Sequence, residues 1–468
     1  MEGRGSRDEG RGTVDEIIYA TATELAAAIR ERRVSAVEVV EAHLRRIERH
    51  NPAINAVVTL DGDGAVATAR EVDAALARGE YGGPLHGVPV TLKDCHATAG
   101  MRTTAGYPPL ADYVPEQDGT IAARLKAAGA IVLGKTNVST LLADVQSSNA
   151  LFGRTNNPWH LERTPGGSSG GAAAVVAAGM VPLEIGSDIG GSIRIPAHCC
   201  GIVGLKPTEH RVSNHGHIPD LPTHPRSTRI MNCIGPMAHS IDDLDLALRV
   251  IAGPDGYDLD VPPVPLPEVV SSPLGSFRLA WASSFPDLPI QRDTRAAIER
   301  LASTLAGEGV AIEEALPAID FEEQLAVRAR LREVVRIFIE QPVGGPPSAE
   351  DYLRALDGRD RFVRVWEAFF GHYDALICPV QMTTAFEHRE RGVPVPVDGV
   401  DQPYELLPDY CRGFNLTGHP VVTIPIGRDT DGLPIGIQIV GARWSEARIL
   451  GIAKAIAEVV APVGRPSL

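Results

Sequence analysis

The sequence predicts an α/β protein: a single large domain in which helices cover both faces of a central, mixed but mostly parallel, twisted β-sheet. Apolar runs of strand length alternate with helical patterns along most of the chain, which favours strands joined by helices. With 468 residues, 44% of them hydrophobic, the chain can bury a large core. The late apolar runs 421–426 and 435–440 are typical of central strands, which need partners from the first half of the chain.

Two capping boxes predict the first helices, which begin after Thr21 and Ser35, because each of these residues is followed by glutamate at the third position. The second helix is expected to end at Asn51-Pro52, since proline disfavours the helical conformation of the residue before it. We then expect strands at 53–60, 88–92, 131–133, 278–282 and 311–316, and helices at 65–78, 121–128 and 293–305.

Residues 253–276 include the proline-rich run PPVPLPEVVSSP, which could mark a domain boundary. We interpret it as a surface connection within one sheet, because the late strands need neighbours from the first half. The domain is therefore expected to span residues 14–468. Residues 1–13 are polar and of mixed charge, and we expect them to be disordered.

Charge and composition exclude several classes of function. A formal net charge of −15 opposes binding to nucleic acid or to anionic membranes. The chain has no apolar run long enough to span a membrane and no secretory signal, and its cysteines form no CxxC pair. We therefore expect reduced thiols and a cytoplasmic protein. A homodimer is compatible with the sequence, but no feature requires one.

Two motifs match known site patterns in spelling only. The segment 129–136, GAIVLGKT, fits the phosphate-binding loop, but its variable positions are themselves a predicted strand. Residues 166–170, GGSSG, fit the nucleophile elbow of α/β-hydrolases, but Arg163-Thr164-Pro165 before them is poor material for a strand. Because the chain has 14 histidines, an α/β-hydrolase with a Ser-His-Asp triad remains the alternative.

Lys93 is the most informative single residue. Lysine occurs only five times among 44 basic residues, yet Lys93 stands at the end of the apolar run GVPVTLKD. Unlike arginine, a lysine desolvated by apolar surroundings can lose its proton and act as a base. From this stretch alone, an ion pair with Asp94 is an equally good interpretation.

Two glycine-rich segments contain candidate reactive serines. TPGGSSGG, at 164–171, precedes an apolar helical pattern, and its small residues allow unusual backbone conformations around Ser168 and Ser169. In GSDIGGS, consecutive glycines before Ser192 can turn amide groups toward one point, where they stabilise an oxyanion. A flexible linker and a tight turn are the structural alternatives. The co-occurrence of both segments with Lys93 favours a reactive site.

With these segments, the sequence resembles the amidase signature family. The resemblance covers most of residues 20–460 and implies the amidase signature fold. It also implies a hydrolase that cleaves the C–N bond of a small-molecule amide or carbamate (urethane), with neither metal nor organic cofactor and with ester hydrolysis as a side activity. The residues that carry it are GVPVTLKD, GAIVLGKTN, NNPWHLERTPGGSSGGAAAVVAAGMVPLEIGSDIGGSIRIPAHCCGIVGLKPT, GPMAHSIDDL, NLTGHPVVTIPIG and GLPIGIQIVGARW.

The resemblance assigns a role to each candidate residue. It makes Ser192 the nucleophile and Lys93 the base. Ser168 is the bridging serine, preceded by a cis peptide bond from Gly167, and Ser169 completes the cradle. The implied oxyanion hole consists of the backbone amides of Ile189, Gly190, Gly191 and Ser192.

Within the family, the glutaminase-like subunit of tRNA-dependent amidotransferases usually carries an acidic-aromatic run after GKTN and glutamine after GGSIR. This chain has Val138-Ser139-Thr140-Leu141 and Ile195 there, which favours a stand-alone bacterial amidase. Loops at 209–229, 328–347 and 381–389 are expected to select the substrate. With only 5% aromatic residues and such loops, we expect the chain to accept bulky, fairly apolar secondary amides or carbamates.

Overall fold

One β-sheet runs through the part of the chain that the computed structural model describes, residues 17–222, 224–339, 345 and 347–468. Its 11 strands are β1 (Val57–Leu60), β2 (Pro89–Lys93), β3 (Ile131–Thr136), β6 (Leu183–Asp188), β7 (Val203–Lys206), β8 (Cys233–Ala238), β9 (Arg278–Trp281), β10 (Ala311–Glu314), β11 (Ala375–Pro379), β14 (Val421–Arg428) and β15 (Pro434–Val440). They follow the order β1-β3-β2-β6-β8-β7-β14-β15-β11-β9-β10. Two small ribbons pair β4 (Ser148–Asn149) with β5 (Gly153–Arg154) and β12 (Val395–Val397) with β13 (Val400–Gln402).

The sheet is mixed, as expected, but the prediction that it is mostly parallel is wrong. Parallel pairing joins β3 to β2, β2 to β6, β11 to β9 and β9 to β10. The six other neighbouring pairs are antiparallel. The late strands β14 and β15 illustrate the reason: residues 429–433 between them are too few for a helical crossover, so the two strands form a hairpin.

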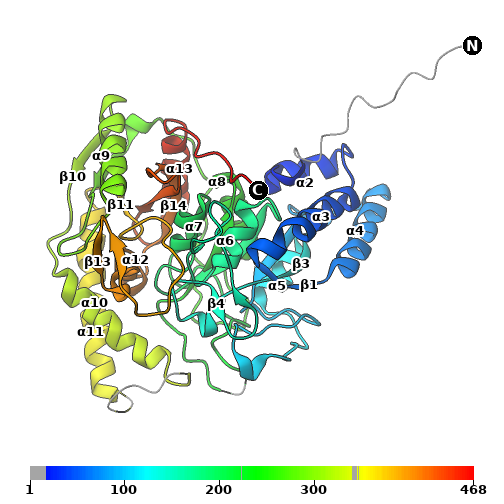
Figure 1. Ribbon diagram of the computed structural model, residues 1–468, viewed down its shortest axis with the longest axis horizontal. Coiled ribbons are helices and arrows are strands. Elements are labelled where there is room, and N and C mark those ends of the chain that lie inside the picture. Colours follow the sequence, from blue (N-terminus) through cyan, green and yellow to red (C-terminus); the bar gives the residue numbers. More distant parts are fainter. Residues whose placement is uncertain (1–16, 223, 340–344, 346) are drawn as a thin grey trace, which may run out of the picture.

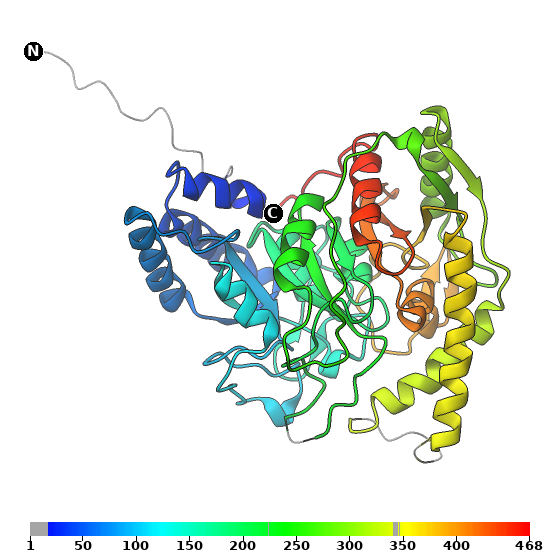
Figure 2. The ribbon, with the colours of Figure 1, turned by 180° about the vertical axis from the view of Figure 1, so that it is seen from behind.

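Helices cover the sheet, as predicted. They are α2 (Ala22–Arg30), α3 (Ala36–Ile54), α4 (Gly62–Ala77), α5 (Thr120–Ala127), α6 (Gly170–Ala177), α7 (Arg194–Cys200), α8 (Ile241–Ile251), α9 (Arg292–Gly307), α10 (Phe321–Val335), α11 (Ala349–Phe370), α12 (Asp409–Thr417) and α13 (Glu446–Ala457). Short 3-10 turns lie at Pro108–Leu110, Thr140–Leu142, Leu274–Ser276 and Tyr404–Leu406. α3, α6 and α7 face the viewer in Figure 1, whereas α5, α8 and α13 face the viewer from the opposite side in Figure 2. All residues of α6 are buried, because it consists only of glycine, alanine and valine.

Both predicted capping boxes are present, but α3 does not end at Asn51-Pro52. It continues over the proline to Ile54 because the local groups compensate for the missing amide. The Asn51 side chain accepts hydrogen bonds from the amides of Ala56 and Val57, both at 2.8 Å, and closes the end of the helix. The strand predicted at 53–60 is correspondingly shorter, since β1 begins only at Val57.

Strands from both sides of residues 253–276 belong to the same sheet, so this proline-rich stretch connects parts of one α/β domain. Most of its residues are exposed or half-buried. The predicted disorder of residues 1–13 concerns positions outside the described residues. Within the described ranges, no helix combines the length and the apolar character that crossing a membrane requires.

Candidate active site

Lys93 is the last residue of β2, a strand whose residues are all buried. β2 pairs in parallel with β3 and β6, so it lies inside the sheet. The Lys93 side chain is fully buried, and its Nζ donates to Ser168 Oγ (2.8 Å), Ser187 Oγ (3.0 Å) and the Ser187 carbonyl (3.3 Å). The Asp94 carboxylate instead accepts the Thr104 amide at 3.0 Å. Lys93 therefore contacts the first serine segment and not its acidic neighbour.

Burial lowers the pKa of Lys93 from 10.5 to about 8, because the apolar interior disfavours the charged amine. Cys95, Asp188 and Glu184 act in the opposite direction, but burial outweighs them. With this pKa, about one tenth of the lysine is neutral at pH 7 and about half at pH 8. Lys93 can therefore accept and release a proton within the range in which most enzymes work.

The segment TPGGSSGG forms a packed cradle and not a linker. The peptide bond between Gly167 and Ser168 is cis. A Cβ at Gly167 would lie 2.7 Å from a neighbouring backbone, so only glycine fits there. Ser147 Oγ donates to the Ser168 carbonyl (3.0 Å) and accepts from the Gly170 amide (2.8 Å), and Ser169 Oγ donates to a carbonyl of β6 (3.3 Å). These bonds fix the position of the Ser168 hydroxyl.

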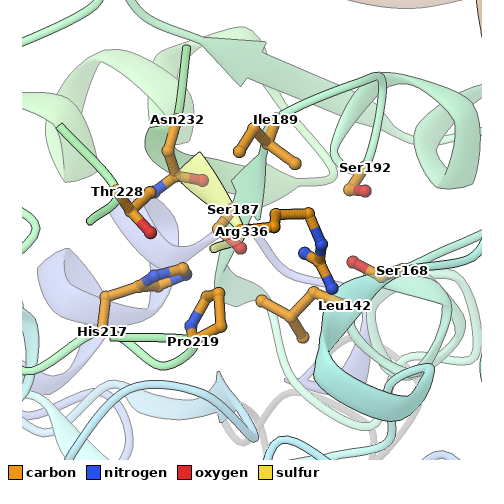
Figure 3. A pocket seen from close by; sticks show the side chains of 10 residues that line it. All are labelled: Leu142, Ser168, Ser187, Ile189, Ser192, His217, Pro219, Thr228, Asn232 and Arg336. Carbon is orange, nitrogen blue, oxygen red and sulfur yellow. The ribbon is translucent and has the colours of Figure 1, made fainter. Parts of the chain in front are cut away.

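Ser192 lies between the end of β6 and the start of α7. Its side chain is 7% exposed and lines the same small pocket as Ser168 (Figure 3). Gly191, with φ +112°, allows the backbone to turn sharply here. The Gly191 amide donates to Asp188 Oδ1 at 2.8 Å. One of the four amides expected to face an oxyanion is therefore already engaged within the protein, which corrects that part of the prediction.

A buried ion pair that the sequence reasoning missed supports this turn. Arg194 donates to Asp188 through Nη2 (2.9 Å) and Nε (3.0 Å), and both side chains are fully buried. Asp188 also accepts the Ile193 amide (3.1 Å) and Asn415 Nδ2 (2.9 Å). Burial alone would raise the pKa of the Asp188 carboxyl, but Arg194 and Asn415 hold it well below its usual range. An acid and an arginine that flank GGS were the available signal.

Replacing Asp188 with asparagine should lower the free energy of unfolding by about 3–5 kcal/mol, because Arg194 would stay buried without a counter-charge. Urea unfolding followed by circular dichroism measures the loss. The double variant Asp188→Asn/Arg194→Met is the matched control and should recover part of the stability, since it leaves no charge unpaired. Equal stability of Asp188→Asn and the wild type would contradict this account of the turn.

Two cavities meet at Ser192. The smaller one, drawn in Figure 3, is lined by both serines and by His217. The larger one has a volume of about 370 Å³. Among the described residues, neither ring nitrogen of His217 has a hydrogen-bond partner, so this histidine is not joined to either serine as a Ser-His-Asp triad would require. The residues that line both cavities are Leu142, Ile189, Ser192 and Arg336.

Two of the three segments predicted to select the substrate reach these cavities. Pro219 and Thr228 of segment 209–229 line the smaller one. Residues 328–336 line the larger one, but they form the end of α10 and not a loop. Five of the residues that line the larger cavity are arginines, so the expectation of a fairly apolar substrate does not agree with its charge.

Two other buried ionisable groups lie close to the site without contacting the serines. Burial lowers the pKa of Lys135 to about 8, but its Nζ donates to Thr98 Oγ1 (2.8 Å) and to the His96 carbonyl. Burial raises the pKa of Glu184 to about 8, and its carboxyl accepts from Thr91 and Thr136. Lys135 belongs to strand β3, as predicted for GAIVLGKT, and not to a phosphate-binding loop.

Comparison with known proteins identifies several with the same fold. Residues 38–339 and 320–450 match the protein family described as Amidase. A glutamyl-tRNA(Gln) amidotransferase subunit from Moorella thermoacetica is 34% identical over 485 residues, which cover 94% of this chain and 96% of that protein. A bacterial aryl acylamidase of the amidase signature enzymes is 25% identical, with a TM-score of 0.83 over 96% of this chain and 99% of the other. A substrate complex of 6-aminohexanoate cyclic dimer hydrolase is 27% identical, with a TM-score of 0.81 and coverages of 96% and 99%.

Proposed function

From the premise that the chain belongs to the amidase signature family of hydrolases, we propose that it cleaves the C–N bond of an amide or a carbamate through an acyl-enzyme on Ser192. One observation carries the proposal: the Lys93 amine is fully buried and lies 2.8 Å from Ser168 Oγ. A neutral amine held next to a hydroxyl group is the arrangement by which lysine activates serine. The similarity to an amidotransferase and to an acylamidase supports the same chemistry.

In the proposed mechanism, two proton transfers prepare the nucleophile. Neutral Lys93 takes the proton of Ser168 while Ser168 takes the proton of Ser192, and Ser192 Oγ attacks the carbonyl carbon. When the tetrahedral intermediate collapses, Ser168 gives a proton to the departing nitrogen, because an amine leaves poorly as an anion. Water then attacks the acyl-enzyme by the same relay and frees Ser192.

The negative charge of the intermediate develops beside the turn before α7. We assign its stabilisation to the amides of Ile189, Gly190 and Ser192, since the Gly191 amide is bound to Asp188. The buried Asp188–Arg194 pair holds these amides in place before the substrate binds. Because the donors are fixed in advance, little reorganisation is needed during the reaction.

The rate of hydrolysis should increase with pH through an apparent pKa of about 8, the value for Lys93. Below this pH the lysine is protonated and cannot accept the Ser168 proton, whereas above it the amine is neutral. Well below pH 8, kcat/KM should therefore fall about tenfold for each pH unit. Steady-state kinetics with an uncharged amide from pH 5.5 to 9.5 measure the limb. A rate that stays constant down to pH 5.5 would argue against Lys93 as the base.

A substrate panel tests the proposed reaction class. It contains a primary amide, an anilide, an aryl carbamate and an aryl ester, each incubated with the purified chain alone. We expect hydrolysis of at least one C–N substrate. Release of product from the ester alone, or from none of the four, would contradict the proposal. Amides and carbamates present the same carbonyl group to Ser192, so only their relative kcat/KM values can rank them.

The similarity to an amidotransferase component supports a second candidate, in which the chain works as the glutaminase-like subunit of a larger assembly. Val138-Ser139-Thr140-Leu141 and Ile195 depart from the pattern of that subunit and favour a stand-alone enzyme. The two candidates differ in what they need. A stand-alone amidase is active as the purified chain, whether size-exclusion chromatography shows a monomer or a homodimer. An amidotransferase subunit would prefer glutamine and depend on a second protein.

A further inference from the structure

An arginine-rich cavity opens beside Ser192. This chain has a net charge of −15, yet five arginines line this one cavity, accompanied by three acidic residues. Such a local excess of positive charge runs against the composition of the whole chain. The five arginines are Arg328, Arg332, Arg336, Arg391 and Arg412.

The cluster is built by two helices that pack against each other, α10 and α12. Arg328 and Arg332 are one turn apart on α10, and Arg336 follows at the C-terminal end of this helix. Like charges at this spacing repel each other along a helix. Arg412 comes from α12 and faces the same cavity. The fold therefore brings together cations that would separate in the absence of a compensating anion.

Arg328 is the central member of the cluster. Its side chain is only 6% exposed, and its Nη2 donates to the Ile189 carbonyl at 3.0 Å, next to the catalytic turn. Its Nε is buried and has no hydrogen-bond partner among the described residues. Burial, together with the charges of Arg412 and Arg332, lowers the pKa of the Arg328 guanidinium well below its usual value. A buried donor in cationic surroundings is a position at which a bound anion is strongly stabilised.

The acidic residues of the cavity compensate only part of this charge. Asp409 accepts from Arg412 Nη1 at 2.6 Å, and Asp144 accepts from the Tyr404 hydroxyl at 2.7 Å. Burial raises the pKa of both carboxyl groups, which makes them weaker counter-ions. Arg412 Nε is, like Arg328 Nε, buried without a partner in the described structure. Two guanidinium groups thus keep donors available for a ligand.

We propose that the substrate carries a carboxylate, which the arginines of this cavity, above all Arg328 and Arg412, bind while the scissile carbonyl lies at Ser192. This inference rests on the proposed function and narrows its substrate class. A carboxylate matches the planar fork of a guanidinium and can accept two hydrogen bonds from it. The position of the cavity next to Ser192 places this recognition within the reach of a small molecule.

Matched substrate pairs test the proposal. One pair, glutaramate and pentanamide, differs by a carboxylate on the acyl side. The other, 4-acetamidobenzoate and acetanilide, differs by a carboxylate on the leaving group. In at least one pair, kcat/KM should be about 10- to 100-fold higher for the anionic member, and the ratio should decrease with added salt. Equal rates within both pairs would overturn the proposal.

Variants locate the effect. Arg328→Gln and Arg412→Gln should reduce the ratio of anionic to neutral kcat/KM toward one. Arg354→Gln is the matched control, because Arg354 is exposed on α11 and pairs with Glu350, so this variant should keep the wild-type ratio. A ratio that is unchanged in both cavity variants would contradict the assignment of these arginines.

A binding measurement separates this inference from the proposed hydrolysis. Glutarate should raise the melting temperature of the wild type, whereas the neutral 1,5-pentanediol should not, and Arg328→Gln should lose the shift. If glutarate stabilises the protein but no amide is hydrolysed, the carboxylate site stands and the proposed function fails. If neutral amides are hydrolysed and glutarate gives no shift, the proposed function stands and the carboxylate site is refuted.

Discussion

Replacing Ser192 with alanine should reduce kcat for amide hydrolysis by at least about 10⁴-fold, because the acyl-enzyme cannot form without its oxygen. The Ser192 side chain lines a cavity, so its removal leaves no gap in the core. The far-ultraviolet circular dichroism spectrum and the melting temperature should stay close to those of the wild type. Steady-state kinetics on the best substrate of the panel give the size of the loss.

Ser139→Ala is the matched control for this loss. Ser139 is buried, but its hydroxyl bonds only to the backbone of Asp144, so the variant should retain most of the wild-type kcat. If Ser192→Ala kept kcat within about tenfold of the wild type, another group would have to be the nucleophile.

Replacing Lys93 with methionine should reduce kcat/KM by about 10³-fold, since it removes the base but preserves the volume of the side chain. The remaining activity should no longer show the acid limb near pH 8, because the group that titrates there is absent. Lys93→Arg should be inactive as well, although it keeps a positive charge, because a guanidinium does not release its proton. Complete pH profiles of both variants measure these effects.

Lys135→Met provides the matched control for this prediction. Lys135 is a second fully buried lysine with a pKa of about 8, but it contacts His96 and Thr98 and neither of the two serines. Its replacement should cost stability and much less activity. If both variants lost activity equally, contact with Ser168 would not be what distinguishes Lys93.

Local patterns in the sequence were sufficient for most elements of the fold. Capping boxes and periodicity placed α2, α3 and the strands β2, β3, β9, β10, β14 and β15 close to their observed positions. They could not supply strand direction, because direction depends on how far the chain travels between strands. The short connection between β14 and β15 was the available clue to a hairpin. Nor could they show that α3 passes over Pro52, since this depends on the bonds of the Asn51 side chain.

The candidate site was predictable where its residues lie in continuous motifs. Lys93, Ser168 and Ser192 stand in glycine-rich or apolar segments, and the resemblance to a family assigned their roles. The arginine cavity was not predictable in this way. Arg328, Arg391 and Arg412 belong to segments far apart in the sequence, and only the packing of α10 against α12 brings them to Ser192. In isolation, each of them is typical of a solvated surface arginine.

The pH dependence of a covalent reaction at Ser192 tests the central claim most directly. Phenylmethylsulfonyl fluoride is incubated with the chain at a series of pH values, and peptide mass spectrometry locates and quantifies the adduct. We predict a single adduct on Ser192, formed at a rate that increases with pH through a midpoint of about 8 and that is strongly reduced in Lys93→Met. An adduct on another residue, or labelling of Ser192 at the same rate with and without Lys93, would contradict the account.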